Sequence, residues 1–217
     1  MRTLFITSTG TEIGKTYVTA ALARHYKAES ERVAVLKPVL SGFDPEDFAQ
    51  SDPALLLAAI DEAPTLKAVE RVSPFRYRAP LAPNQAAAKE GRTVDFDAIV
   101  RCCEDAASAG GDLLLIEGIG GLMVPLDESH TVLDLIAALG APILLVTGSY
   151  LGTISHTLTA VEVAKARKLS IHAIVISESE GSTVSLEDTA ATIRQFTELP
   201  VATLTRGGSI QSLTDLL

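Results

Sequence analysis

The sequence predicts an α/β fold: an open, mainly parallel sheet with helices on both of its faces. Three observations predict it. Short apolar runs alternate along the chain with helical patterns, most of these runs are continuously apolar, and polar or glycine-rich segments follow several of them. Continuous apolar runs are typical of strands that helices cover on both sides. A chain of 217 residues is expected to form one domain, spanning 1–217.

Six apolar runs are the candidate strands: Leu4–Ile6, Val33–Leu36, Leu113–Ile116, Ile143–Val146, Ile171–Ile176 and Val201–Leu204. Six segments carry helical patterns: about Lys15–Ala28, Pro53–Ile60, Phe96–Ala109, Val132–Leu139, Ile154–Lys168 and Leu186–Phe196. In the third helical segment Phe96, Ile99 and Cys103 recur at the spacing of one buried helix face. The proline-rich stretch 61–92 is less regular, and we expect it to be an ordered excursion over the sheet.

The charge balance argues against a nucleic-acid partner. Eighteen Lys and Arg against 27 Asp and Glu give a formal charge of −9, which repels a phosphodiester backbone. The apolar runs are all far shorter than the roughly 18 residues that span a bilayer. The start of the chain, Met1–Ile6, leads directly into a loop and leaves no room for a signal peptide. We therefore expect a cytoplasmic protein without a membrane partner.

The segment Ser8–Thr16 is a candidate phosphate-binding loop, because it lies between the first candidate strand and the first candidate helix. Successive backbone N–H groups and a helix N-terminus bind phosphates there. Lys15 would hold the terminal phosphates and the Thr16 hydroxyl would ligate Mg²⁺. The usual pattern G-x-x-x-x-G-K-[ST] has glycine where this chain has Thr9, so the loop is deviant. The alternative interpretation, that Gly14 to Thr16 merely start a helix, is disfavoured by the strand-then-helix context, which favours a P-loop NTPase-like fold.

Polar residues follow three other candidate strands. Lys37 follows the second, Glu117 the third and 147–153 the fourth. The carboxyl ends of parallel strands meet at one edge, so we expect these residues beside the phosphate loop. A lysine directly after a buried strand suits an anion partner, and Glu117 has the place of the acid that reaches nucleotide-bound Mg²⁺. Gly118 and Gly120 would let the chain turn close to a ligand. The alternatives are a surface lysine and a solvated acid in a tight turn.

Asp52 has two interpretations. The run Ser51-Asp52-Pro53 is typical of a helix N-cap followed by proline at the first helical position, so from the residues alone Asp52 is expected to cap a helix. The adjacent Cys102 and Cys103 are interpreted as packing thiols, and the four histidines lack metal-ligand spacing.

Five motifs occur in a characteristic order: the phosphate loop, Lys37-Pro38-Val39-x-Ser41-Gly42, Ser51-Asp52, Glu117-Gly118-x-Gly120-Gly121 and Leu151-Gly152-Thr153-Ile154-Ser155-His156. With them the chain resembles dethiobiotin synthetases from residue 3 to about 175, and the segment 78–84 looks like that family's substrate loop. The resemblance implies a ligase of biotin biosynthesis that uses ATP and Mg²⁺. It would join CO₂ to 7,8-diaminononanoate and close the cyclic urea, through a carbamate and a carbamic-phosphoric anhydride.

The resemblance also implies roles for residues. Lys37 and Lys15 are the expected catalytic residues, and Thr16, Asp52 and Glu117 the expected Mg²⁺ ligands. The expected nucleotide contacts are Glu12, Ile13, Gly14, Lys15, Thr16, Tyr17, Asp52, Glu117, Gly118, Gly120, Ser177 and Glu178. The expected substrate contacts are Thr11, Lys37, Ser41, Leu151, Gly152 and Ser155. The family forms homodimers with the substrate site at the subunit interface. Because Ser177 and Glu178 stand where the family has an Asn-Asp pair that reads adenine, we predict weakened nucleotide selectivity.

Three alternatives to a synthetase have discriminating features. A nucleotide switch of the partition or septum-positioning kind shares the sheet and a deviant loop, but carries an additional lysine at the start of that loop. An amide-forming relative that acts on a corrin precursor would need a glutaminase region, for which this chain is too short. A non-enzymatic binding protein remains an alternative if Ser8 disables the phosphate loop.

Overall fold

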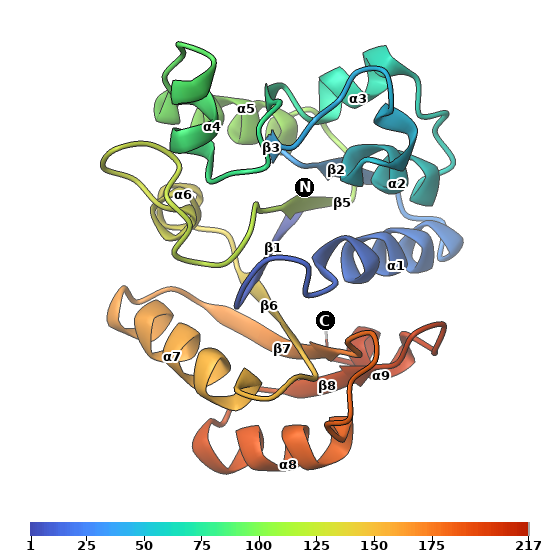
Figure 1. Ribbon diagram of the computed structural model, residues 1–217. Helices are drawn as coiled ribbons and strands as arrows, with labels where there is room; N and C mark the ends of the chain where they lie inside the picture. Colours follow the sequence, from blue (N-terminus) through green and yellow to red (C-terminus); the bar gives the residue numbers. More distant parts are fainter. Residues whose placement is uncertain (217) are drawn as a thin grey trace.

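The computed structural model describes residues 1–216, and in this part of the chain the main sheet has six strands. They are β1 (Arg2–Ser8), β2 (Val33–Leu36), β5 (Leu113–Glu117), β6 (Ile143–Gly148), β7 (Ile171–Ser177) and β8 (Val201–Leu204). Their order is β2-β5-β1-β6-β7-β8, and every neighbouring pair is parallel. The sheet and its six strands thus confirm the predicted fold class (Figure 1).

Helices cover both faces of this sheet. The cluster on one face includes side chains of α5 (Phe96–Ser108), α6 (Val132–Leu139), α7 (Thr153–Ala166) and α8 (Leu186–Phe196). The cluster on the other includes side chains of α1 (Lys15–Ala28), α2 (Asp52–Ala59) and α9 (Gln211–Thr214). In Figure 1 α5 lies near the top, α6 and α7 on the left and α8 at the bottom, whereas α1 and α9 lie toward the right. Successive residues of one strand serve opposite faces, as Leu4 and Phe5 do.

The stretch 61–92 is ordered, as expected, but it contains elements that the sequence interpretation did not resolve. These are α3 (Leu66–Val72), β4 (Phe75–Tyr77) and α4 (Pro83–Lys89). Strand β4 pairs in parallel with β3 (Val39–Ser41) as a separate small sheet, and a short 3-10 helix, η1 (Phe48–Gln50), precedes α2. A hydrophobic cluster that includes Phe43, Leu57 and Val69 joins this region to α2.

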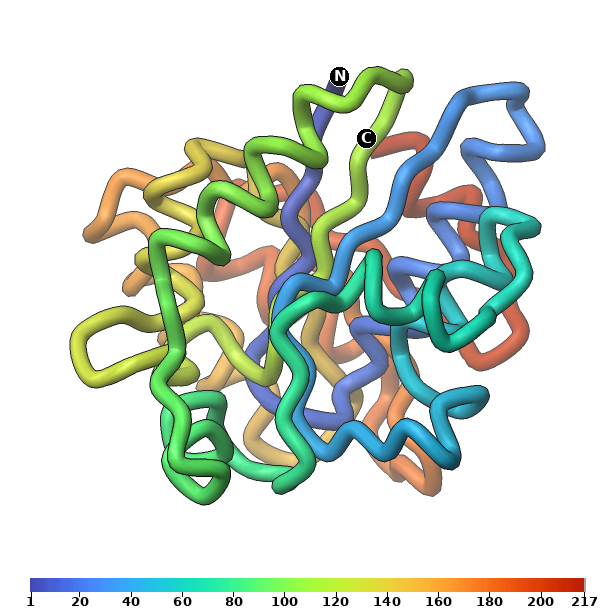
Figure 2. Tube along the Cα trace, turned by 90° about the horizontal axis from the view of Figure 1, so that it is seen from above, coloured from blue at the N-terminus to red at the C-terminus, as the bar shows by residue number. Residues whose placement is uncertain are grey.

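The architecture gathers the functional loops at one end of the sheet. Figure 2 shows the N-terminus and the turn at 109–112 together at one end of the molecule, with the phosphate loop and the segment 78–84 at the opposite end. This opposite end is where β1, β2, β5 and β6 finish, so the predicted meeting of their polar continuations is confirmed. Within residues 1–216, the helices are too short or too polar to cross a bilayer.

Candidate functional site

The phosphate loop connects β1 directly to α1. Gly14 precedes the first residue of α1 with φ +93°, and Glu12 also has a positive φ of 58°. A Cβ atom at Gly14 would lie 2.6 Å from the Ser177 hydroxyl oxygen, so glycine is required by its backbone angle and by the space. The loop therefore presents the start of a 14-residue helix to the adjoining space, an arrangement that favours anions.

Ser8 ends β1 and is fully buried beneath the loop. Its hydroxyl oxygen lies 2.6 Å from the carbonyl oxygen of Gly10 and 2.9 Å from that of Gly120, and Lys15 Nζ donates to it over 3.1 Å. The Ser8 hydroxyl has one proton, so it donates to one of these carbonyls at a time while it accepts from Lys15. Ser8 thus joins the phosphate loop to the segment after β5.

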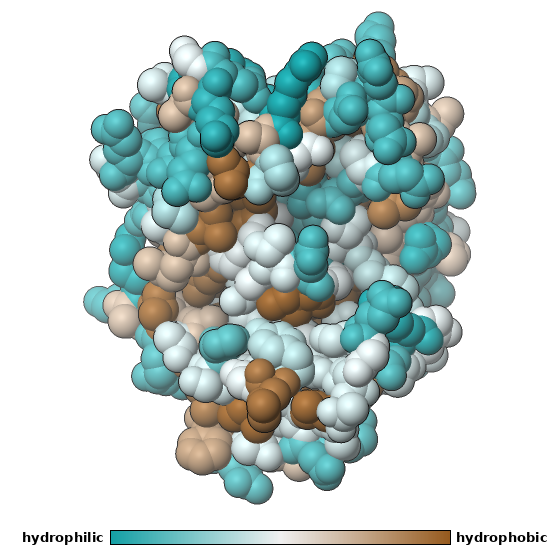
Figure 3. Space-filling model, viewed as in Figure 1, coloured by the Kyte–Doolittle hydropathy of each residue, from teal (hydrophilic) through white to brown (hydrophobic). Residues whose placement is uncertain are grey.

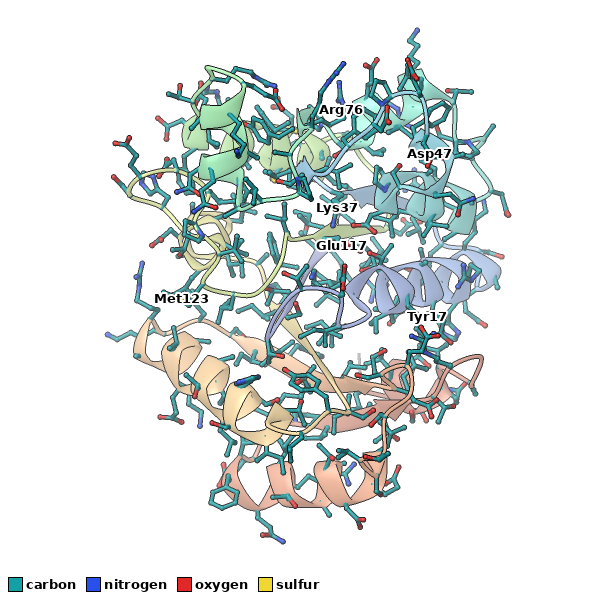
Figure 4. The ribbon with its side chains drawn as sticks, viewed as in Figure 1. Tyr17, Lys37, Asp47, Arg76, Glu117 and Met123 are labelled. Carbon is teal, nitrogen blue, oxygen red and sulfur yellow. The ribbon has the colours of Figure 1, made fainter. Side chains whose placement is uncertain are left out.

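Lys37, Glu117 and Asp52 form a charged cluster beside the loop. Lys37 Nζ lies 2.7 Å from Glu117 Oε1 and 2.9 Å from Asp52 Oδ2. Thr16 also donates to Glu117 Oε1, over 2.8 Å. Figure 4 shows Lys37 and Glu117 side by side near the middle of the molecule. The Lys37 side chain is 3% exposed and the Glu117 side chain 0% exposed, so their charges compensate each other in the interior.

The two lysines have opposite pKa shifts. Burial acts to lower the pKa of Lys37, but the Glu117 and Asp52 carboxylates outweigh it and raise that pKa to about 12. Burial lowers the pKa of Lys15 to about 8, and the nearby Lys37 ammonium adds to this effect. Burial acts to raise the pKa of Asp52, but the Lys37 ammonium outweighs burial and holds that pKa below its usual value. Lys37 therefore keeps its charge well above neutral pH, whereas Lys15 loses its charge around pH 8.

The expectation that Asp52 caps a helix is wrong. Helix α2 begins at Asp52 itself with Ser51 at the N-cap position, and the Asp52 carboxylate lies against Lys37. The Ser51 hydroxyl donates to the carbonyl of Phe48, in the 3-10 helix before α2. The competing need of the buried Lys37 ammonium for a carboxylate partner explains why Asp52 turns away from its own helix.

A cavity of about 580 Å³ adjoins the loop and the charged cluster. One part of its wall consists of predicted site residues: Thr11, Glu12, Ile13, Gly14, Lys15, Thr16, Lys37, Ser41, Asp52 and Gly120. The rest of its wall is largely apolar: Leu40, Pro80, Leu81, Ala82, Pro83, Ile119 and Val124. Glu117 contacts this wall through Lys37 and Thr16. The structure thus brings charged, polar and apolar side chains together in the wall of one cavity.

The other predicted site residues lie outside the cavity wall. Gly118 packs beside the Phe5 ring, and its carbonyl accepts a hydrogen bond from Lys37. Ser177 lies next to Gly14, on the far side of the loop. Tyr17 and Glu178 contact the segment after β8: the Tyr17 hydroxyl accepts from the Gly207 amide over 2.8 Å, and Glu178 Oε2 accepts from the Arg206 amide over 2.8 Å.

Leu151, Gly152 and Ser155 lie at the start of α7. Gly152 precedes the helix with φ +98°, and Leu151 is 94% exposed. Figure 3 shows apolar side chains at the surface in the region of α7 and α8. The resemblance implies that these three residues contact the substrate at a subunit interface. In the single chain they are exposed, and they lie at the end of the sheet where the phosphate loop also lies.

The apolar cavity residues Leu40, Ile119 and Val124 were missed by sequence reasoning. They come from segments whose residue types do not differ from those of core positions, and only the fold brings them to the cavity. The cavity residues of segment 80–83 could be expected from the sequence, because the resemblance identifies 78–84 as a substrate loop. Ser8 also had a signal, because the sequence raised the alternative that it disables the phosphate loop, but the residues gave no structural role for it.

The chain matches a family model described as an AAA domain over residues 2–216. It is 49% identical over 211 residues to an ATP-dependent dethiobiotin synthetase from Caulobacter sp. (strain K31), covering 96% of this chain and 90% of that protein. It is 48% identical over 214 residues to a synthetase of the same name from Methylobacterium nodulans, covering 96% of this chain and 95% of that protein.

Among solved structures, the chain is similar to the septum site-determining protein MinD complexed with Mg-ADP from Pyrococcus horikoshii OT3. The TM-score is 0.54 at 17% identity, over 100% of this chain and 86% of that one. At this identity the similarity shows the fold alone, a P-loop NTPase fold, and it does not favour the septum-positioning alternative. The sequence comparisons are specific, and they show that this chain is a member of the ATP-dependent dethiobiotin synthetase family.

Proposed function

We propose that the protein joins CO₂ to 7,8-diaminononanoate and closes the product to dethiobiotin at the expense of ATP. The observation that carries the proposal is the cavity itself, whose wall holds Lys15 and Lys37 together with several apolar side chains. The lysine ammonium groups suit the phosphates, and the apolar side chains suit an aliphatic chain.

Three steps account for the atoms. An amine nitrogen of the substrate attacks the carbon of CO₂ and loses a proton, which gives a carbamate. A carbamate oxygen then attacks the γ-phosphorus of ATP, and ADP leaves. The second amine attacks the carbamate carbon, the C–O bond to phosphate breaks, and inorganic phosphate leaves with that oxygen. The remaining proton passes to solvent, and the cyclic urea is complete.

Lys37 and Lys15 would act by position and charge. Phosphoryl transfer depends mainly on alignment and on cancelling charge at the transferring group. Lys37 is buried and held in place by Glu117 and Asp52, so its ammonium is fixed before substrates bind. Lys15 rests on neutral acceptors, Ser8 Oγ at 3.1 Å and the Gly10 carbonyl at 3.5 Å, and a phosphate oxygen would be a much stronger partner.

The residues fit a magnesium ion. Among residues 1–216, the buried Glu117 Oε2 has no hydrogen-bond partner, although Oε1 of the same carboxylate has two. Thr16, Asp52 and Glu117 would hold Mg²⁺ through oxygen atoms, and Mg²⁺ commonly uses only one or two protein carboxylates together with substrate phosphates. The bound ion would neutralise charge on the phosphate groups.

The substrate contacts follow the mixed lining of the cavity. Thr11, Lys37 and Ser41 are among its polar lining residues, and within the described chain the buried Ser41 hydroxyl lacks a protein partner, which suits a polar ligand atom. The aliphatic chain would lie along Leu81 and Val124. We further propose a homodimer in which the start of α7, at Leu151, Gly152 and Ser155, binds the substrate carboxylate of the neighbouring subunit.

The nucleotide base would lie beyond Gly14, near Tyr17, Ser177 and Glu178. Glu178 is engaged with the Arg206 amide, and Ser177 offers a short hydroxyl to the base. We therefore expect similar turnover with ATP, CTP and GTP. A strong preference for ATP would contradict this prediction of weak selectivity, and would leave the proposed reaction itself in place.

The test of the function is reconstitution. The purified protein receives 7,8-diaminononanoate, bicarbonate and MgATP, and cyclic urea is measured by mass spectrometry together with released phosphate. We expect one phosphate for each cyclic urea, and no product when the diamine or bicarbonate is omitted. ATP hydrolysis that proceeds equally without the diamine would contradict the proposal and support the nucleotide-switch alternative.

A further inference from the structure

Four threonine hydroxyls form a connected cluster between the phosphate loop and the start of α7. They belong to Thr9, Thr147, Thr153 and Thr157. Thr147 is at the centre: its hydroxyl oxygen lies 3.1 Å from that of Thr9, 2.7 Å from that of Thr153 and 2.9 Å from that of Thr157. Thr147, Thr153 and Thr157 are at most 1% exposed, so the cluster is shielded from solvent except at Thr9.

The protons of this cluster have a defined direction. Each hydroxyl donates one hydrogen bond. Thr153 donates to the carbonyl of Gly148 over 2.6 Å, so its oxygen accepts from Thr147. Thr147 has then used its own proton, and it accepts from Thr9. The chain of donation thus runs from Thr9 through Thr147 and Thr153 to a backbone carbonyl.

The cluster connects two segments that are far apart in sequence. Thr9 is the first residue after β1, and its amide donates to the carbonyl of Val146 over 3.0 Å. Thr153 is the first residue of α7. The other interior positions of β6 before Thr147 are apolar, from Ile143 to Val146, so a threonine there stands out from its own strand. Valine has nearly the shape of threonine but lacks the hydroxyl, so it would remove the hydrogen bonds of this position and leave the space filled.

We propose that Thr147 is a positioning residue that holds the phosphate loop and the first turn of α7 in one fixed relation. Nucleotide binding at the loop then orders the segment 149–156, at the start of α7. The inference rests on the proposed function in one respect only: that this segment binds the substrate carboxylate, so that ordering it favours diamine binding.

The test compares Thr147→Val with Thr147→Ser, which keeps the hydroxyl. Amide hydrogen exchange in 149–156 is measured with and without MgADP, which needs no turnover. In the wild type and in Thr147→Ser, MgADP is expected to slow exchange in this segment. In Thr147→Val the factor by which MgADP slows this exchange is expected to be about three- to tenfold smaller, because one hydrogen bond between neutral groups contributes a factor of this size. Affinity for MgADP itself is expected to change less than this.

Kinetics give the second measurement. Thr147→Val is expected to raise KM for diaminononanoate about three- to tenfold with a smaller change in kcat, and Thr147→Ser to restore the wild-type value. The inference is overturned if MgADP does not slow exchange in 149–156 of the wild type, or if Thr147→Val behaves as the wild type. If Thr147→Val does not fold, Thr9→Val removes the same link at the half-buried end of the cluster. Failure to form cyclic urea would contradict the proposed function, while the exchange measurement would still decide the role of Thr147.

Discussion

Lys37 keeps its positive charge in the interior because two carboxylates lie within 3 Å of its ammonium nitrogen. Removing the lysine would leave the buried Glu117 carboxylate without its principal counter-charge, and among residues 1–216 only the Thr16 hydroxyl would still donate to it. An unpaired buried charge costs several kcal/mol, more than a lost surface ion pair. A substitution here therefore affects stability as well as chemistry, and the two effects need to be separated.

We expect Lys37→Ala to lower turnover by orders of magnitude and the free energy of unfolding by about 3 kcal/mol. The double variant Lys37→Ala with Glu117→Gln is expected to regain most of that stability, because the unpaired charge is gone, and none of the turnover. Urea unfolding and the phosphate-release assay check both. The exposed Lys89→Ala on α4 serves as the control. Near-normal kcat in either Lys37 variant would contradict the role assigned to Lys37.

Lys15 predicts a pH dependence of nucleotide binding. Its pKa in the free protein is about 8, whereas bound phosphates favour the ammonium form. Below pH 8 Lys15 is already charged and affinity is expected to be level. Above pH 8 binding must take up a proton, so affinity is expected to fall by up to about tenfold for each pH unit. Lys37, with a pKa of about 12, stays charged throughout this range.

Isothermal titration calorimetry with MgADP between pH 6 and pH 10, in buffers of different ionisation enthalpy, measures both the affinity and the proton uptake. Lys15→Arg is the matched variant, because arginine keeps its charge over the whole range. Level affinity up to pH 10 in the wild type would contradict the low pKa of Lys15.

At the scale of elements, the loop between β1 and α1 depends on Gly14 for two separate reasons, its positive φ and the Ser177 hydroxyl against it. Gly91 offers a matched control: its φ is +64°, and within the described chain a Cβ there would meet open space. We expect Gly91→Ala to cost about 1 kcal/mol of unfolding free energy, and Gly14→Ala about 1 to 3 kcal/mol more from overpacking. Thermal unfolding measures the stability of both variants, and titration measures their affinity for MgADP. Wild-type MgADP affinity in Gly14→Ala would contradict the close contact between position 14 and Ser177.

The long elements were predictable because their patterns are strong. Strands such as β5 are continuously apolar, and α5 repeats its apolar residues at helical spacing. The short elements α3 and α4 have seven residues each, too few for a period to show. Their ends nevertheless carried signals, since the Thr65 hydroxyl accepts from the Ala68 amide at the start of α3, and α4 begins at Pro83.

At the scale of the whole molecule, the charged half of the candidate site was predictable because strand ends of a parallel sheet meet at one edge. Lys37 and Glu117 could be placed together by topology alone. The contact that the Asp52 carboxylate makes could not be predicted. Its own helix and Lys37 compete for this carboxylate, and only the packed structure shows which contact forms. The apolar side chains could not be predicted either, because Leu40 lies in the three-residue strand β3 and Val124 in the loop after β5, and both segments are too short or too irregular to carry a pattern of their own.

The proposed dimer gives a prediction at this scale. Leu151 is 94% exposed beside the start of α7, which suits a contact with a second subunit. We expect Leu151→Asp to yield a monomer in light scattering after size exclusion, and to raise KM for diaminononanoate more than KM for ATP. Leu55→Asp, at a 45% exposed position on α2, is the control and is expected to leave the dimer intact. A monomeric wild type would contradict the shared site.

The central claim is that the cavity beside the phosphate loop activates a carbamate by phosphorylation. The most direct measurement supplies bicarbonate labelled with ¹⁸O, diaminononanoate and MgATP, and follows the label into released phosphate by mass spectrometry. We predict one labelled oxygen in the phosphate for each cyclic urea formed, because the carbamate oxygen that attacks phosphorus leaves with it. Phosphate that carries oxygen from water instead would contradict phosphorylation of a carbamate.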